Sequence, residues 1–549
     1  MNRSVLSLAL LAAATAVAPA QLSAQCPANP LSALSGTWTF NVQALPIANV
    51  AFRDLNSYAV AGQFRASIGT DRAGNPTGLL AINATANLNG STTRLENDAG
   101  SYQINSVCSG GTITMNLSSY PMQYDFWFAN GGQTINLVST IGGRSATGTA
   151  VMGATSCPAG LVEPLTLVNG AYAFKFQHLA LTDFFFDQTY GIAGRMVASV
   201  GTDRANNPIG VLAITATSNF STEHSVTRLE KDTGRYQINS DCSGGTLTFN
   251  LSSKPYQYQF YFRADFQEFY VINTSNAAIY GVVTRSNPAV GCGLRPLSLL
   301  SGPWTFNMQV ISKDAADANW AVTGRWVASE STDRAGNPLG VLNINASSIQ
   351  SSTRVGLVNA TRLENDLGRY QLNEDCTGGT LTMNLSSFPM QYDFWFYDNL
   401  QKIYFVSTSP GRGATGSATK GVSGCPVGVT PLSLLSGTYN FKIQRIPNFT
   451  IEPYGIAGFF TAAIGADRAG NPQGQLAITA TASIGAAGSI VRLERDIGRY
   501  QIEDDCTGGS LIFNLSSRPV QFQFYFREGF QDMDVISQVG PAAFGVVTR

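Results

Sequence analysis

Apolar and polar residues alternate with a period of two along most of this chain. The stretch Gly36 to Val42 is an example, and similar runs follow near residues 58–68, 78–86, 112–117, 123–128, 134–139 and 146–152. Successive side chains of a strand point to opposite faces, so this alternation predicts half-buried β-strands. We predict eight or nine antiparallel strands in about 130 residues and no amphipathic helix beyond the N-terminus.

The whole strand pattern occurs four times. Each copy contains a motif that opens with Arg-Leu-Glu, continues through Tyr-Gln and ends in Cys-(Ser/Thr)-Gly-Gly; the copies begin at Arg94, Arg228, Arg362 and Arg492. A fixed period of this kind defines a repeat architecture. The predicted domains are a signal peptide (1–24) and four β modules (25–155, 156–290, 291–423 and 424–549). Shared segments make modules one and three type A and modules two and four type B.

Two segments of each module carry turn residues. The first is Thr70 to Pro76, in which Gly, Asn and Pro predict a hairpin loop, and versions of it recur in the other modules. The second, Asn97 to Gly100, lies inside the central motif, and its Asn-Asp-x-Gly composition predicts a turn between two strands.

The fold class predicted is all-β, with four tandem antiparallel modules. A meander of eight or nine strands leaves no open edge when it closes into a barrel, so an up-and-down barrel is the favoured architecture. A two-sheet β-sandwich is the alternative.

The first strand of each module carries an aromatic residue two positions after a glycine: Trp38, Tyr172, Trp304 and Tyr439. The Gly-x-Trp form resembles the first signature of lipocalin-like (calycin) barrels. The resemblance implies a barrel whose late basic residue, such as Arg285 or Arg549, packs over that ring. The modules also look similar to uncharacterised exported tandem β-repeat proteins of bacteria.

The composition of the chain limits which binding partners and which cellular compartments are possible for it. Hydrophobic residues make up 44% of the chain, charged residues 13%, and the net charge is -1. Without a Lys/Arg run there is no electrostatic footprint for nucleic acid.

The N-terminus has the pattern of a signal peptide. It contains a positive residue, Arg3, then the apolar run Val5 to Val17 and a small-x-small cleavage site at Ala18 to Ala20. The run is too short for a membrane span, and we expect an extracytoplasmic product: secreted, periplasmic or at the cell surface.

Each module contains two cysteines, one at its start and one in the central motif. The repeat symmetry predicts pairing within each module: Cys26–Cys108, Cys157–Cys242, Cys292–Cys376 and Cys425–Cys506. Pairing across modules would leave Cys26 and Cys506 without partners. The two histidines, His178 and His224, have no counterparts in the other modules. We therefore predict no metal site and no cofactor.

Two sets of residues are candidates for chemistry. Glu96 and Asp98 could act as acid and base on a glycosidic bond. We favour a structural role instead, in which Asp98 organises its turn and Arg94 pairs with Glu96 or Asp71.

The second candidate is the outward face of the aromatic strand, which we call the sixth-strand set. Alternation places Tyr124, Phe126 and Phe128 in the core and an amide or carboxylate beside an aromatic ring on the opposite face. Such a face can stack on a sugar or pack beneath a loop. The set is Gln123, Asp125, Trp127, Gln257, Gln259, Tyr261, Gln391, Asp393, Trp395, Gln521, Gln523 and Tyr525.

Three functions follow from these observations. The favoured one is a non-enzymatic exported protein with a surface, adhesion or scaffold role. The second is a multivalent glycan or small-ligand binding protein with one site per barrel, and the third a glycoside-type hydrolase. The partners expected are glycans or other surface components.

Overall fold

The computed structural model describes the four repeats with gaps. The described residues are 26–44, 58–88, 91–117, 120–141, 146–178, 190–220, 225–251, 254–274, 279–286, 292, 295–312, 319–351, 358–385, 388–409, 412–445, 454–484, 489–515, 518–539 and 543–549. The predicted signal peptide lies outside them. No helix in these residues is long and apolar enough to cross a membrane.

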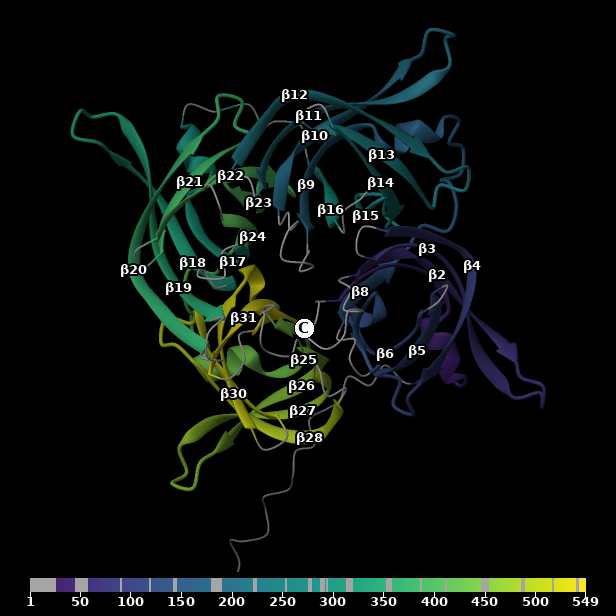
Figure 1. The fold of residues 1–549 in the computed structure, drawn as a ribbon. Helices are drawn as coiled ribbons and strands as arrows, with labels where there is room; N and C mark the ends of the chain where they lie inside the picture. Colours follow the sequence, from purple (N-terminus) through teal and green to yellow (C-terminus); the bar gives the residue numbers. More distant parts are fainter. Residues whose placement is uncertain are drawn as a thin grey trace, which may run out of the picture.

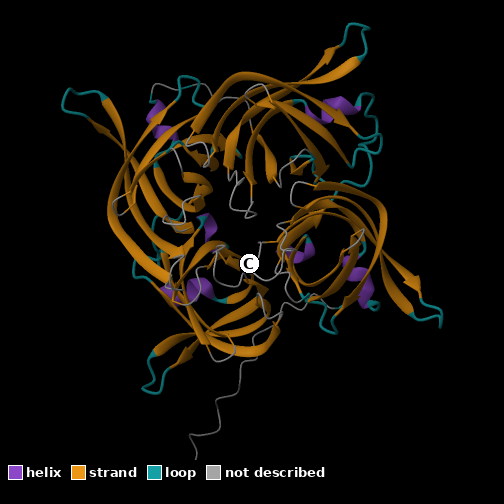
Figure 2. Cartoon of the chain, in the orientation of Figure 1, coloured by secondary structure: helices purple, strands orange, loops and turns teal. Residues whose placement is uncertain are grey.

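The described strands form four closed barrels of eight strands each (Figures 1 and 2). Barrel 1 consists of β1 (Gly36–Ala44), β2 (Tyr58–Thr70), β3 (Pro76–Leu88), β4 (Ser91–Ile104), β5 (Gly110–Leu117), β6 (Tyr120–Ala129), β7 (Thr134–Ser139) and β8 (Ala146–Met152). Barrel 2 consists of β9 (Gly170–His178), β10 (Tyr190–Thr202), β11 (Pro208–Phe220), β12 (Ser225–Ile238), β13 (Gly244–Leu251), β14 (Lys254–Phe262), β15 (Glu268–Asn273) and β16 (Ile279–Ser286).

The last two barrels repeat this order. Barrel 3 consists of β17 (Gly302–Ser312), β18 (Asn319–Thr332), β19 (Pro338–Ser351), β20 (Val358–Leu372), β21 (Gly378–Leu385), β22 (Phe388–Tyr397), β23 (Lys402–Ser407) and β24 (Arg412–Lys420). Barrel 4 consists of β25 (Gly437–Arg445), β26 (Tyr454–Ala466), β27 (Pro472–Ile484), β28 (Ser489–Ile502), β29 (Gly508–Leu515), β30 (Arg518–Phe526), β31 (Asp532–Val539) and β32 (Ala543–Thr548). Short 3₁₀ helices accompany them: η1 (Pro30–Leu34), η2 (Asn130–Gly132), η3 (Pro164–Val168), η4 (Pro296–Leu299), η5 (Pro431–Leu435) and η6 (Glu528–Phe530).

Every strand pairs antiparallel with its sequence neighbour, and the eighth strand of each barrel pairs with the first. The up-and-down barrel prediction is therefore confirmed, with eight strands per module, and the sandwich alternative is wrong. Closure pairs both edges of the sheet, so the barrels described here leave no open strand edge.

The barrel interiors are filled with apolar and aromatic side chains. Tyr124 and Phe126 are fully buried there, as the alternation predicts. The lipocalin-like feature is also confirmed, because the guanidinium of Arg285 lies 5.8 Å from the ring centre of Tyr172 and that of Arg549 5.9 Å from Tyr439. The aromatic residue on the first strand of each barrel thus packs against the barrel core, and in these two barrels a guanidinium also lies over its ring.

The turn predicted at Asn97 to Gly100 is wrong. Strand β4 continues through these residues, and the register shifts so that Ile82 faces Asp98 while Ala84 faces Leu95. Two residues of β4 therefore oppose one residue of β3, which is a β-bulge. The same shift occurs between β11 and β12, β19 and β20, and β27 and β28. A bulge bends its strand and increases the local twist, which helps the sheet to close.

The tyrosine of the central motif ties the sheet to the 3₁₀ helix at the start of its barrel. In barrel 1 the Tyr102 hydroxyl donates to the carbonyl oxygens of Leu31, at 2.9 Å, and Ser67, at 3.3 Å. Its equivalents Tyr236, Tyr370 and Tyr500 bond the corresponding helices at 2.9, 3.0 and 2.9 Å. Burial raises the pKa of Tyr236 to about 12, so this hydroxyl remains a donor at neutral pH.

Replacing Tyr102 with Phe should lower the free energy of unfolding of barrel 1 by about 1 kcal/mol, since the change removes the hydroxyl and leaves its acceptors unpaired. Urea unfolding followed by hydrogen exchange in peptides of each barrel would measure the effect. Barrel 2, which keeps Tyr236, is the internal control. Equal protection of barrel 1 in the variant and the parent chain would contradict the prediction.

All four predicted disulfides are confirmed: Cys26–Cys108, Cys157–Cys242, Cys292–Cys376 and Cys425–Cys506. Each bond joins the start of a module to the turn between its fourth and fifth strands. Disulfides persist in oxidising compartments, so these four bonds indicate an extracytoplasmic environment.

The four barrels form a ring (Figure 1). The second strand of each barrel contacts the sixth and seventh strands of the next: β2 with β14 and β15, β10 with β22 and β23, β18 with β30 and β31. Strand β26 makes the same contact with β6 and β7, which brings the fourth barrel against the first. Each contact joins two different faces, and the arrangement closes after four modules, as in a cyclic assembly of identical subunits.

Candidate functional site

The contacts between barrels use small residues on one side and large ones on the other. Ala59 and Ala61 on β2 form a buried cluster with Tyr261, Tyr270 and Ile272 of barrel 2. At the fourth contact, Ala457 of β26 packs with Trp127 and Val138 of barrel 1. Small side chains on the second strand let the neighbouring aromatic rings approach closely, so the two barrels bury an apolar patch between them.

The structure places most of the sixth-strand set inside these contacts. In each barrel, the two members of the set nearest the carboxyl end of the sixth strand are buried. These eight residues are 1% to 6% exposed: Asp125, Trp127, Gln259, Tyr261, Asp393, Trp395, Gln523 and Tyr525. The remaining four face solvent to a greater extent: Gln123, Gln257 and Gln391 are exposed, and Gln521 is half-buried. The face opposite the core is therefore covered mainly by the preceding barrel in the ring.

A hydroxyl on the third strand bonds the sixth strand at every contact. Where a type B barrel meets a type A barrel, the acceptor is a carboxylate: the Thr217 hydroxyl donates to Asp393 at 2.6 Å, and that of Thr481 donates to Asp125 at 2.7 Å. A hydrogen bond to a buried carboxylate is among the stronger kinds in proteins.

Where a type A barrel meets a type B barrel, the partner is a tyrosine. Thr85 lies 3.0 Å from the Tyr261 hydroxyl, and Ser347 lies 3.2 Å from that of Tyr525. The A-B-A-B order seen in the sequence thus corresponds to two alternating kinds of contact around the ring.

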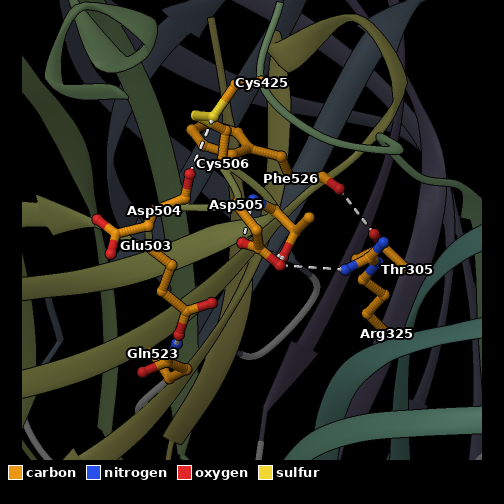
Figure 3. A network of polar contacts seen from close by, with 10 residues as sticks. Thr305, Arg325, Cys425, Glu503, Asp504, Asp505, Cys506, Gln523 and Phe526 are labelled. Atoms are coloured by element: carbon orange, nitrogen blue, oxygen red, sulfur yellow. Dashed lines mark hydrogen bonds and ion pairs between the residues drawn. A yellow bond between two sulfur atoms is a disulfide. The ribbon is translucent and has the colours of Figure 1, made fainter. Parts of the chain in front are cut away.

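Figure 3 shows further polar contacts where barrel 3 meets barrel 4. The Thr305 hydroxyl donates to the carbonyl oxygen of Phe526 at 2.7 Å. The Arg325 guanidinium lies 3.5 Å from the Asp505 carboxylate. These bonds join segments that lie about 180 to 220 residues apart in the chain, so they hold the ring rather than a single barrel.

Ligand binding by the sixth-strand set stays a prediction. In the ring, eight of its twelve side chains are buried against a neighbouring barrel, so a ligand would have to separate two barrels to reach them. The hydrolase hypothesis also stays a prediction, because the side chain of Glu96 lies outside the described residues, while Asp98 is half-buried on β4. In the part of the chain that is described, no group of His, Cys, Asp or Glu side chains is arranged to hold a metal.

The most exposed repeated feature is the hairpin between the second and third strands, which projects outward from each barrel (Figure 2). We call its Asp-Arg-Ala-x-Asn-Pro turn the tip. In barrel 1, the Asp71 carboxylate accepts hydrogen bonds from the backbone amides of Ala73 and Asn75, both at 2.8 Å, and from the Asn75 side chain at 3.1 Å. The tips at Asp203, Asp333 and Asp467 repeat these bonds.

The hydrogen bonds within the tip leave one charged side chain to face solvent. The hydrogen bonds that Asn75 donates lower the pKa of Asp71 below its usual value. This carboxylate therefore stays ionised and remains bound to the donors of its own turn. The adjacent Arg72 is exposed, as are its equivalents Arg204, Arg334 and Arg468. Four equivalent turns thus present four arginines at the outer edge of the ring.

Sequence reasoning located the tips as hairpin loops but missed their outward projection and the contact role of the sixth strand. One signal was present: Asp and Arg recur together in every tip of a chain that is otherwise poor in charge. Projection depends on β2 and β3 staying paired as far as Thr70 and Pro76, past Gly78 and Tyr102, the last pair between β3 and β4, and that register exists only in the folded sheet.

Comparison with known proteins identifies no family for this chain. No protein-family model matches the chain, and no curated protein matches it. Similar solved structures include kievitone hydratase from Nectria haematococca, with 9% identity over 48% of this chain and 95% of that one (TM-score 0.17). A double mutant of transferrin binding protein B from Haemophilus parasuis has 10% identity over 70% and 75% (TM-score 0.17). A DUF3598-family protein from Nostoc punctiforme has 13% identity over 46% and 96% (TM-score 0.13). At these values the similarities support no inference about activity.

Proposed function

We propose that this protein is a non-enzymatic, exported scaffold or adhesion protein whose ring presents four equivalent tips to a polymeric surface partner. The observation that carries the proposal is the repetition of one hydrogen-bonded, arginine-bearing turn on the outer side of all four barrels. The signal peptide pattern and the four disulfides support export.

The tip suits recognition of an acceptor-rich polymer. Its backbone is held by the Asp71 carboxylate, so little conformational freedom remains to be lost on binding. The planar guanidinium of Arg72 matches the geometry of carboxylate and sulfate groups. Apolar side chains lie behind the tip, where Ile68 is 41% and Leu79 44% exposed. A glycan bearing uronic acid or sulfate groups at regular intervals offers matching partners.

Because the ring holds the four tips in one molecule, four weak binding sites can engage one polymeric partner at the same time. Four sites on one rigid frame can raise the apparent affinity for a repeating partner by roughly 10²–10⁴ over a single site. One site inside each barrel is a poorer alternative, because the described barrel interiors are packed with side chains.

Replacing three tip arginines with glutamine (R204Q/R334Q/R468Q) should abolish most of this avidity. Binding of the full chain to immobilised uronate-containing or sulfated polysaccharides, measured by biolayer interferometry, should weaken at least tenfold. The matched control is R235Q/R369Q/R499Q, which removes three exposed arginines from the same barrels and leaves every tip intact. If the two variants lose binding equally, or if the parent chain binds none of the polymers, the proposal is wrong.

A further inference from the structure

The ring encloses a cavity where its four first strands come together. Strands β9, β17 and β25 lie on the inner side of the ring with the last strands of the barrels (Figure 1). Their outward side chains line a partly open cavity of about 250 Å³. Equivalent positions of the four barrels supply two layers: Asn41, Lys175, Asn307 and Lys442 in one, and Gln43, Gln177, Gln309 and Gln444 in the other.

The first layer alternates amide and ammonium groups. The Lys442 ammonium donates to the Thr149 hydroxyl at 2.5 Å. Lys175 lies 5.5 Å from the ring centre of Tyr404, with the carboxylate of Asp534 and the guanidinium of Arg527 as its other charged neighbours. Neither lysine forms an ion pair among the described residues, since Asp534 is bound to Arg527 at 2.7 Å. The cavity therefore carries two half-buried positive charges, neither of which is directly paired with a carboxylate among the described residues.

The second layer has surplus hydrogen-bond donors. The carbonyl oxygen of Gln309 accepts from the Gln177 amide at 2.8 Å, and that of Gln444 accepts from the Thr147 hydroxyl at 3.3 Å. The amide nitrogens of Gln43 and Gln309 are buried and have no hydrogen-bond partner among the described residues. Their side chains are 8% and 4% exposed.

A buried donor without an acceptor is costly, and so is a buried charge without a counter-charge. Both costs disappear when one ligand supplies acceptor oxygens and negative charge together. Two lysines call for a dianion, and the cavity volume suits a small molecule rather than a polymer. Burial lowers the pKa of both lysines to about 8, so most copies of each still carry a proton at pH 7.

From this geometry we infer that the centre of the ring binds a small dianion with several oxygen atoms, held by Lys175 and Lys442 and hydrogen-bonded by Gln43 and Gln309. Sulfate, phosphate and short dicarboxylates share this chemistry. The bound anion joins side chains from all four barrels, so it also stabilises the closed ring against the open one. The site does not depend on the tips or on what they bind.

Isothermal titration of the full chain with sulfate, phosphate, malonate and, as a monoanion, acetate tests the inference at constant ionic strength. The dianions should bind at least tenfold more tightly than acetate. Preference for phosphate and sulfate over malonate would indicate a tetrahedral oxyanion, and the reverse order a dicarboxylate. Because sulfate keeps its charge over this range, its affinity should fall as the pH rises above about 8, where the lysines lose their protons.

The double variant K175Q/K442Q should weaken sulfate binding at least tenfold, because it removes both charges. K175R/K442R keeps the charges and should bind more tightly than the glutamine variant, and R204Q/R334Q/R468Q should bind sulfate as the parent chain does. Thermal unfolding without sulfate checks that each variant folds. Equal sulfate affinity in the parent chain and K175Q/K442Q, or equal affinity of the parent for acetate and sulfate, would overturn the inference.

Discussion

Removing the disulfide of barrel 2 with C157S/C242S is expected to lower the free energy of unfolding of that barrel by about 4.5 kcal/mol. The bond closes a loop of 85 residues, and in the chain-entropy treatment a loop of that length adds this much by restricting the unfolded chain. Such a loss is a large part of the stability of a domain of this size. It is the largest effect we expect from any change within one barrel.

The conformation of the second cysteine provides a sharper comparison. Cys242 has a φ of 55°, in the left-handed region, and Cys108, Cys376 and Cys506 have nearly the same angle. Glycine adopts this conformation more easily than serine. C157S/C242G should therefore be more stable than C157S/C242S by about 1 kcal/mol, although both lack the bond.

Urea unfolding under non-reducing conditions, with hydrogen exchange followed separately for each barrel, would measure both differences. The other three barrels keep their disulfides and report on any global change. If barrel 2 kept its full protection in C157S/C242S, the bond would add nothing to its stability. If the serine and glycine variants were equal, the positive φ would cost nothing.

Opening the ring between its first and last barrels is the second large effect that we expect. Gly455 lies on β26 against barrel 1, where an added β-carbon would overlap the Cγ2 methyl of Thr147. Gly455→Arg would force a long charged side chain into this contact, with the costs of overpacking and of an unpaired buried charge. No linker joins the two barrels, so the contact itself must keep them together.

The expected result is a larger radius of gyration in small-angle X-ray scattering, with four folded barrels arranged as an open arc. Ala463→Arg is the matched control, because it adds the same side chain to an exposed position on the same strand. A milder pair tests the geometry: Gly455→Ala should loosen the ring, and Thr147→Ala, which removes the overlapping methyl, should restore it. Unchanged scattering from Gly455→Arg would contradict the interpretation of this contact as the closure of the ring.

The central motif shows which structural features the local sequence pattern can predict and which it cannot. The sequence predicts a disulfide for its cysteine and a strand for its tyrosine, and both predictions are confirmed, because symmetry and alternation are properties of the sequence itself. The composition of the Asn97 to Gly100 segment predicts a turn, but the segment belongs to a bulged strand. Turn residues and bulge residues share the same tolerance for irregular backbone, so composition does not distinguish the two.

The sixth-strand set shows the same limit for side chains. Alternation correctly separated Tyr124 and Phe126 from Asp125 and Trp127. It did not identify what covers the second face, since a strand has the same pattern whether a loop, a ligand or another barrel lies against it. The lysines of the central cavity were not singled out at all, because Lys175 and Lys442 come together only when barrels 2 and 4 face the same axis.

The sequence by itself determined four repeated β modules, their strand alternation, the pairing of their cysteines and the A-B-A-B order. These are properties of short segments and of their repetition, and they hold wherever the modules lie. The tertiary structure decided the closure of the ring, the burial of the sixth-strand set, the outward tips and the central cavity. The projection of the tips depends on the strand register within each barrel. The other three depend on the angle between successive barrels, which small residues such as Gly455 and Ala457 set by how closely they let two sheets approach.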